Sequence, residues 1–209
     1  MNIIFDLDGT LVNSASGVLD ALSHVIEKHE IESPVELSAD LIGPPLREIL
    51  IRLSSLSKAG DLDLMELTFK SYYDEIGIFK TTQYEGVSQM LRDLKVSGHK
   101  LFIATNKRAI PTHSLMKYFS WDQYFLGIYS LDSFDYPIKD KATLLEKVIH
   151  THQLLKDETI YIGDRPEDNE AAKRCTINFM YASWGYGGND DCSSRINLML
   201  PNEIRMHLK

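Results

Sequence analysis

The chain has 209 residues, of which 44% are hydrophobic and 25% are charged, with a net charge of −8 and a pI near 5.3. This length and composition predict a globular protein with one full domain and room for a smaller insertion. An acidic chain without a Lys/Arg-rich run is not expected to bind nucleic acid or an anionic membrane. Two cysteines, no leader segment and no apolar run of ~20 residues predict a reduced, cytoplasmic protein.

The first predicted element is a buried strand that ends in two aspartates. Ile3, Ile4 and Phe5 form an apolar run without an alternating polar face, which is typical of a parallel strand covered on both sides. Because side chains in a strand repeat every two residues, Asp6 and Asp8 are expected to point the same way. Two adjacent negative charges are costly unless a cation binds or one pKa is raised, so the pair predicts a catalytic or metal site. A solvated acidic turn is the alternative.

Residues 14–80 are predicted to form an all-helical insertion after that strand. The segment 16–30 carries a one-sided apolar stripe and begins after Asn13 and Ser14, which are both able to cap a helix. Two further helical stripes are expected, one formed by Leu46, Ile49, Leu50 and Leu53 and the other by Leu64, Leu67, Tyr72 and Ile76.

Helices and strands alternate along the rest of the chain. Helices are expected near 85–96, from 111 onward, at 142–154 and at 167–174, and strands at 100–104, 125–130, 159–162 and 177–181. This alternation predicts an α/β fold with a doubly wound, Rossmann-like parallel sheet, whose ligands bind beyond the carboxyl ends of the strands. The expected core is residues 1–13 and 81–209, and the expected helical cap is residues 14–80.

The polar residues that follow the predicted strands suit phosphoryl transfer. Besides the two aspartates after the first strand they are Thr105, Asn106, Asp164 and Asp168, and Lys141 begins a neighbouring helix. A carboxylate can act as a nucleophile, further acids can hold a hard cation, and an ammonium and a hydroxyl can bind phosphoryl oxygens. These groups are expected to converge at one edge of the sheet.

Four motifs resemble those of the haloacid dehalogenase-like hydrolases, in the family's order. They are Asp6-Leu7-Asp8-Gly9-Thr10, Thr105-Asn106, Lys141 and Gly163-Asp164-Arg165-Pro166-Glu167-Asp168. The resemblance covers nearly the whole chain, and the 14–80 insertion is similar to the family's small helical cap. The cap also contains Ile42-Gly43-Pro44-Pro45-Leu46-Arg47, which resembles the phosphoglycolate phosphatase branch.

The resemblance implies a magnesium-dependent phosphatase that acts on a small phosphorylated metabolite through an aspartyl-phosphate. It assigns the nucleophile to Asp6 and the acid and base steps to Asp8. Mg²⁺ would be held by Asp6, the Asp8 main-chain carbonyl and Asp164. Thr105 and Lys141 would hold the phosphoryl oxygens, and Asn106 would contact the substrate. A dehalogenase is not expected, because those relatives lack a carboxylate at the position of Asp8.

Three of these assignments have a second interpretation. Lys139 could bind the phosphoryl group in place of Lys141, because this segment departs from the Lys-Pro pairing of many relatives. Thr105 could only cap the turn after its strand. Asp168 is expected to orient either Lys141 or the ligands of the metal, and not to bind the metal itself. The alternative is that Asp168 is only an acid in the first turn of a helix, where the helix dipole favours a negative charge.

Two further features also allow alternatives. Arg47 is expected to reach a substrate carboxylate or phosphate, or else to pair with nearby acids at the surface. The segment 184–189 is either a flexible loop at the mouth of the site or a glycine-rich turn. For function, the alternatives are a sugar-phosphate mutase of the same family and a non-catalytic binding protein on this fold. The expected partner is a small phosphate ester, and the chain is expected to be a monomer or a homodimer.

Overall fold

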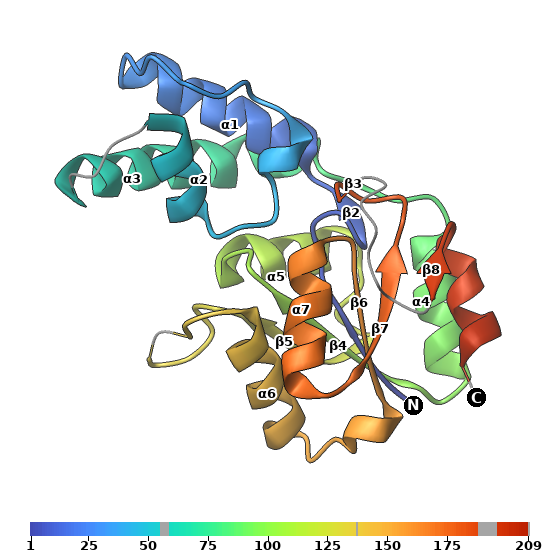
Figure 1. The fold of residues 1–209 in the computed structure, drawn as a ribbon. Helices are drawn as coiled ribbons and strands as arrows, with labels where there is room; N and C mark the ends of the chain where they lie inside the picture. Colours follow the sequence, from blue (N-terminus) through green and yellow to red (C-terminus); the bar gives the residue numbers. More distant parts are fainter. Residues whose placement is uncertain (55–58, 137, 188–195, 209) are drawn as a thin grey trace. The chain divides into compact units, whose positions relative to one another are not determined.

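The computed structural model describes residues 1–54, 59–136, 138–187 and 196–208 (Figure 1). The chain divides into two compact units. One unit consists of Met1–Val12 and Gln83–Lys209, and the other of Asn13–Thr82.

A six-stranded parallel sheet forms the framework of the first unit, and β1 (Asn2–Phe5) lies in its interior. β1 pairs with β4 on one side and with β6 on the other (Figure 1), so the residues after β1 lie between the ends of two neighbouring strands. The predicted α/β fold is therefore confirmed. The strand order is β5-β4-β1-β6-β7-β8, with β4 at Lys100–Thr105, β5 at Phe125–Ser130, β6 at Thr159–Gly163, β7 at Asn178–Ala182 and β8 at Asn197–Leu198.

Helices pack against this sheet and bury its strands. Ile4, Phe102 and Tyr161, from three adjacent strands, share one apolar cluster with side chains of α6 and α7. All four residues of β1 are buried, because its alternate side chains face opposite sides of the sheet and both sides are covered. The helices of this unit are α4 (Val87–Val96), α5 (Ala109–Tyr118), α6 (Lys141–Thr151) and α7 (Pro166–Cys175), with 3-10 helices η3 (Lys156–Glu158) and η4 (Pro201–His207).

The second unit is helical, so the predicted helical insertion after β1 is present. Short strands β2 (Val12–Asn13) and β3 (Thr82–Gln83) form a separate two-stranded sheet at the points where the chain passes from one unit to the other. The elements of the insertion are α1 (Ala15–Lys28), η1 (Ala39–Leu41), α2 (Leu46–Ser54), α3 (Ala59–Glu75) and η2 (Gly77–Lys80).

The apolar stripe predicted for the third cap helix is wrong. Leu64 and Leu67 are 58% and 64% exposed, and Ile76 lies beyond the end of α3. The apolar residues of α3 occur on more than one side of the helix, so periodicity alone could not select the face that packs. The buried face of α3 is formed instead by Leu62, Met65, Phe69 and Tyr73.

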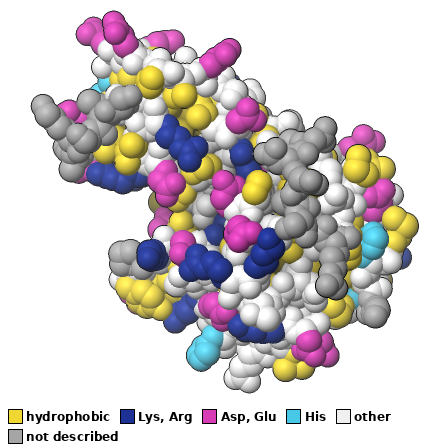
Figure 2. Space-filling view, viewed as in Figure 1, with side chains coloured by type: hydrophobic (Ala, Val, Ile, Leu, Met, Phe, Trp, Pro, Cys, Tyr) yellow, Lys and Arg dark blue, Asp and Glu magenta, His cyan; other side chains and the backbone are white. Residues whose placement is uncertain are grey.

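The surface carries charges of both signs. Acidic and basic side chains are interspersed over the described part of the face shown in Figure 2. Within the described ranges, no helix is both long enough and apolar enough to cross a bilayer.

Candidate active site

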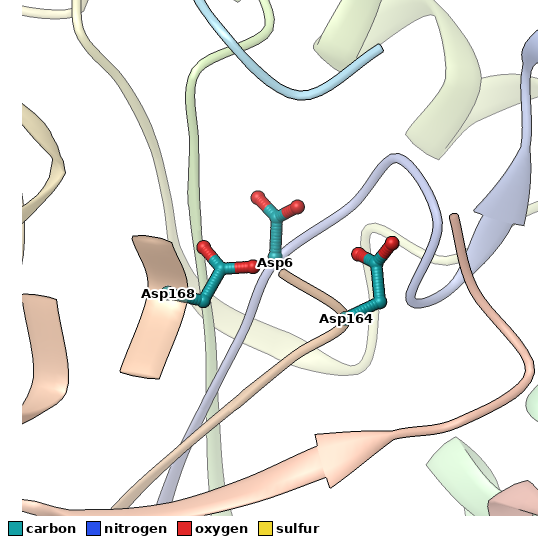
Figure 3. Close-up of side chains that lie close together, drawn as sticks. All are labelled: Asp6, Asp164 and Asp168. Carbon is teal, nitrogen blue, oxygen red and sulfur yellow. The ribbon is translucent and has the colours of Figure 1, made fainter. Parts of the chain in front are cut away.

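Three buried aspartates meet beyond the carboxyl ends of β1 and β6. The backbone N–H of Asp6 donates to the carbonyl of Ile162 at 2.8 Å, which extends the pairing of β1 and β6 by one residue. Asp164 directly follows β6, and Asp168 lies in the first turn of α7. One carboxylate oxygen of each aspartate lies within 4.8 Å of the others (Figure 3). The sheet register therefore brings together residues that are far apart in the sequence.

Asp6 is ion-paired within the protein. Its Oδ1 accepts a hydrogen bond from Lys141 Nζ at 2.7 Å, and the residue is only 5% exposed. Burial raises the pKa of Asp6 to about 6, the Lys141 ammonium opposes that rise, and the neighbouring Asp168 carboxylate adds to it. Above that pH Asp6 is a carboxylate, which is the form able to act as a nucleophile.

Lys141 is the first residue of α6, and its position is fixed from two directions. Asp140 caps the helix by accepting the Thr143 N–H at 2.8 Å. The ammonium also donates to Asp168 Oδ1 at 3.1 Å. Burial tends to lower the pKa of Lys141, but the carboxylates of Asp168 and Asp6 outweigh it and hold the pKa above its ordinary value. The alternative lysine, Lys139, is exposed.

Tyr161 is a site residue that the sequence prediction missed. Its side chain is fully buried, and its hydroxyl accepts from Lys141 Nζ at 2.9 Å and donates to Asp168 Oδ1 at 3.0 Å. Asp168 Oδ2 accepts the Arg165 N–H at 3.2 Å, so both oxygens of Asp168 have protein partners. Asp168 therefore holds Lys141 and the start of α7. The sequence signal for Tyr161 is a hydroxyl in the middle of a mostly apolar strand.

Asp164 is enclosed more tightly than the other acids. Its Oδ1 accepts from the Thr10 hydroxyl at 3.1 Å, and its Oδ2 accepts from the Tyr186 N–H at 2.7 Å. Burial raises the pKa of Asp164 to about 8, with further contributions from the Asp168 and Asp6 carboxylates. A Cβ atom at Gly9 or at Gly185 would overlap the Asp164 side chain, and Gly9 has φ of 85°. Glycine is therefore required at both positions for Asp164 to be placed here.

The described part of the 184–189 segment packs onto the same site. Trp184 Nε1 donates to the carbonyl oxygen of Thr10 at 2.9 Å, and a Cβ atom at Gly187 would overlap the backbone of Asp164. Residues 184–187 thus line the Asp164 side of the site. The last two residues of the predicted segment, 188 and 189, lie outside the described residues.

Asp8 is held by a lysine that was also missing from the predicted set. Lys107 Nζ lies 3.0 Å from Asp8 Oδ1 and 3.3 Å from Asp8 Oδ2, and the two side chains are 6% and 13% exposed. Lys107 comes two residues after Thr105, the last residue of β4. Lys107 directly follows Asn106, so the strand-end rule that predicts Thr105 and Asn106 includes Lys107 when it extends one residue further.

The predicted substrate-binding residues Thr105 and Asn106 lie at the carboxyl end of β4, as expected. Thr105 is 1% exposed, and its Oγ1 accepts the Lys107 N–H at 3.2 Å. This contact caps the turn after β4, which is the alternative role predicted for Thr105. In this contact the Thr105 oxygen is an acceptor, so the hydroxyl can still donate its own hydrogen. Asn106 follows it and is partly buried.

Arg47 belongs to the helical unit and is paired there. Its Nη1 donates at 2.7 Å both to Asp63 Oδ1 and to Glu66 Oε1, and the side chain is 42% exposed. These bonds connect α2 to α3. They match the surface pairing that was foreseen as the alternative for Arg47.

The acids of the site can accommodate a metal ion. Four carboxylates (Asp6, Asp8, Asp164 and Asp168) share the site with two ammonium groups, and a divalent cation would offset the excess negative charge. Carboxylate oxygens are the ligands that hard cations such as Mg²⁺ prefer. Burial and the neighbouring carboxylates raise the pKa values of Asp6 and Asp164, so a positive charge beside them would favour their ionised forms. The residues present therefore fit a divalent cation.

Comparisons with known proteins agree with this geometry. A family model described as haloacid dehalogenase-like hydrolase matches residues 3–182. The tyrosine-protein kinase PtkA of Mycobacterium tuberculosis is 28% identical over 191 residues, which are 90% of this chain but 64% of that protein, so the chain spans less than two thirds of this relative. The phosphoglycolate phosphatase of Psychrobacter arcticus is 27% identical over 198 residues, covering 90% of this chain and 86% of that protein.

A solved structure shares the fold. It is a haloacid dehalogenase-like family hydrolase from Streptococcus pneumoniae, with a TM-score of 0.85 and 27% identity. The match covers 99% of this chain and 97% of that one. The two proteins are therefore similar over the core and the helical insertion alike.

Proposed function

The chain belongs to the haloacid dehalogenase-like hydrolases, and we propose that it is a magnesium-dependent phosphatase of small phosphorylated metabolites that works through an aspartyl-phosphate. The main support is the position of Asp6. Its carboxylate follows an interior strand of a parallel sheet, is buried, and is ion-paired with Lys141 at 2.7 Å. Parallel sheets bind their ligands beyond such strand ends.

In the first proposed step, Asp6 attacks the phosphorus of the substrate in line with the leaving oxygen. A bond forms between an Asp6 carboxylate oxygen and phosphorus while the bond from phosphorus to the ester oxygen breaks. Asp8 gives a proton to the departing oxygen, which leaves as an alcohol. Lys141 and the Thr105 hydroxyl would hold the phosphoryl oxygens during this transfer, and Asn106 would contact the bound substrate.

In the second step, water attacks the phosphorus of the aspartyl-phosphate. Asp8 takes a proton from this water, inorganic phosphate leaves, and the Asp6 carboxylate is regenerated. A single residue can serve as acid and then as base because the attacking water takes the place of the departing oxygen. The proton therefore moves from Asp8 to oxygen in the first step and from oxygen to Asp8 in the second. Tyr161 and Asp168 would keep Lys141 in place throughout, through the contacts of 2.9 Å and 3.1 Å that they make with its ammonium.

The proposed metal is Mg²⁺, held by the side chains of Asp6 and Asp164 and by the main-chain carbonyl of Asp8. Its chemical contribution is to neutralise negative charge on the phosphoryl group. Asp168 is assigned instead to the orientation of Lys141, whose ammonium lies 3.1 Å from Asp168 Oδ1.

The proposed substrate is a small phosphate monoester, with phosphoglycolate as the first candidate. The cap segment that ends at Arg47 and the Psychrobacter arcticus relative both support this choice. One relative is named a tyrosine-protein kinase, and the chain spans 64% of that protein. A mutase would use the same core residues.

A phosphate-release screen tests the proposal. Purified protein with Mg²⁺ should release inorganic phosphate from one or more of phosphoglycolate, sugar phosphates and nucleoside monophosphates, and excess EDTA should abolish the release. An isomeric sugar phosphate as the product would identify a mutase instead. Absence of both products across the panel and with an aryl phosphate would contradict an enzymatic role. Asp6→Asn serves as the inactive control.

A further inference from the structure

Each of the two central aspartates has its own lysine, and the two lysines come from different elements. Asp6 is paired with Lys141 at the start of α6, and Asp8 is paired with Lys107 in the turn after β4. The proposed roles of Asp6, Asp8 and Lys141 leave Lys107 without a function. Lys107 is nearly buried and contacts both carboxylate oxygens of Asp8, so a role that acts through Asp8 is the one to consider.

We propose that Lys107 is a positioning residue that orients the Asp8 carboxylate for the hydrolysis of the aspartyl-phosphate. This inference rests on the function proposed above. In the hydrolytic step Asp8 must be a carboxylate with one oxygen directed at the attacking water. An ammonium that contacts both oxygens at 3.0 and 3.3 Å restrains the rotation of the carboxylate about its terminal bond.

The local structure explains why a lysine at this position can act as a rigid support. The Lys107 backbone is anchored, because its N–H donates to Thr105 Oγ1 at 3.2 Å. Its side chain is only 6% exposed, so the ammonium is shielded from water that would weaken the pair. Asp8 lies in a tight turn, in which the backbone N–H groups of Gly9, Leu11 and Val12 donate hydrogen bonds to other backbone carbonyls of the turn. These hydrogen bonds restrain the main chain around Asp8, but they do not restrain its carboxylate.

With 4-nitrophenyl phosphate as the substrate, the loss of Lys107 is expected to affect one step only. Misplacing a catalytic group by about 1 Å can cost ~10²-fold in rate. The first step with 4-nitrophenyl phosphate requires little help from Asp8, because 4-nitrophenolate leaves readily without a proton. The second step always requires a base for the water. Loss of Lys107 should therefore slow hydrolysis of the phospho-enzyme and spare its formation.

The test follows 4-nitrophenol release by stopped flow in the full-length protein with Mg²⁺. Lys107→Met should give a rapid burst of about one equivalent per enzyme and then a steady-state rate about 10- to 100-fold below wild type. Asp8→Asn should give a burst of the same kind. Adding Lys107→Met to Asp8→Asn should slow the steady state by less than twofold, because the lysine then has no carboxylate to orient. Lys107→Arg should restore most of the wild-type rate.

Matched variants separate positioning from a loss of structure. Lys117→Met removes an exposed lysine of α5 and should behave as wild type. Inorganic phosphate should inhibit Lys107→Met and wild type at similar concentrations, because the proposed phosphoryl contacts are intact. A Lys107→Met protein with no burst, or one that slows Asp8→Asn a further tenfold, would overturn the inference. If wild type itself releases no 4-nitrophenol, the proposed function fails rather than the role of Lys107.

Discussion

Lys141 Nζ lies 2.7 Å from Asp6 Oδ1, so the proposed nucleophile is ion-paired before any substrate arrives. The same ammonium contacts Asp168 and Tyr161, which fixes it beside the carboxylate. A phosphoryl group that reached Asp6 would therefore meet a positive charge already in position. Such preorganised charge is commonly the largest contribution to catalysis of phosphoryl transfer.

The first prediction concerns this lysine. Lys141→Met should lower kcat/KM for an aryl phosphate by about 10²- to 10³-fold, because it removes the charge that stabilises the transferring phosphoryl group. Lys139→Met should retain wild-type activity, because Lys139 is exposed. Steady-state kinetics of both variants would decide between the two lysines. A larger loss in Lys139→Met than in Lys141→Met would contradict the assignment.

The second prediction concerns pH and the stability of the metal-free protein. The pKa values of Asp6 and Asp164 are raised in the folded state, to about 6 and about 8, mainly by burial. Between about pH 4 and about pH 8 the folded state therefore holds protons that the unfolded state has released, and its stability falls as pH rises. In EDTA, the melting temperature should be lower at about pH 8 than at about pH 5.5, and Mg²⁺ should raise it more at the higher pH.

Asp164→Asn is the control for this effect. The amide cannot ionise, so this variant should lose much of the decline in stability between the two pH values. It should also lose much of the stabilisation by Mg²⁺. If the metal-free wild type instead gained stability relative to Asp164→Asn as pH rises from 5.5 to 8, the raised pKa of Asp164 could not be the cause of the pH dependence.

The third prediction concerns the cap of α6. Asp140 accepts hydrogen bonds from the backbone N–H and the hydroxyl of Thr143, and from Arg174 Nη1 at 3.0 Å. The Thr143 N–H bond contributes most to lowering the pKa of Asp140 to about 2. Asp140→Ala should reduce the free energy of unfolding by about 1 kcal/mol at neutral pH, as measured by urea denaturation.

The pH dependence of this difference follows from the lowered pKa. A carboxylate with a lowered pKa stabilises the folded state above its unfolded pKa near 3.8, and this stabilisation is lost as pH falls toward 2. The difference between wild type and Asp140→Ala should therefore shrink on acidification below about pH 4. Asp140→Asn retains a capping oxygen and should remain close to wild type at neutral pH. An unchanged Asp140→Ala protein would show that the cap has no energetic role.

The fourth prediction concerns the helical unit. We propose that it acts as a cap that governs substrate choice, with Arg47 as a contact for an anionic group of the substrate. Both observed bonds of Arg47 come from Nη1, so its other nitrogens are donors that a substrate could use. Arg47→Ala should raise the Michaelis constant for carboxylate-bearing phosphate esters more than for a neutral aryl phosphate. Arg52→Ala, a change at an exposed arginine of α2, should not. An unchanged substrate ranking and unchanged Michaelis constants in Arg47→Ala would remove Arg47 from substrate selection.

The strand-end residues could be predicted from sequence because the rule behind them is geometric. Parallel strands end at one edge of a sheet, so Asp6, Thr105 and Asp164 had to be neighbours once the alternating pattern was recognised. The family and the α/β fold, both predicted from these motifs, are confirmed. The individual roles of the site residues stay predictions, because geometry alone does not report reactivity.

Other features could not be predicted because they depend on tertiary packing. Tyr161 contacts Lys141 only because β6 lies against β1 and α6 packs on that face, and no local pattern marks that contact. The buried face of α3 was assigned incorrectly because Leu64 and Leu67 are apolar but point outward. A single helix with apolar residues on more than one side does not identify its own packing partner.

The role of Asp6 as the nucleophile is tested most directly by locating the phosphoryl group on the enzyme. Asp8→Asn lacks the group that activates water, so a phospho-enzyme formed from 4-nitrophenyl phosphate should accumulate. Rapid acid quench, proteolysis and mass spectrometry should find the adduct on a peptide that contains Asp6. Asp6→Asn treated in the same way should carry no adduct. A phosphoryl group on a serine or histidine, or on Asp6→Asn itself, would contradict the assignment of Asp6 as the nucleophile.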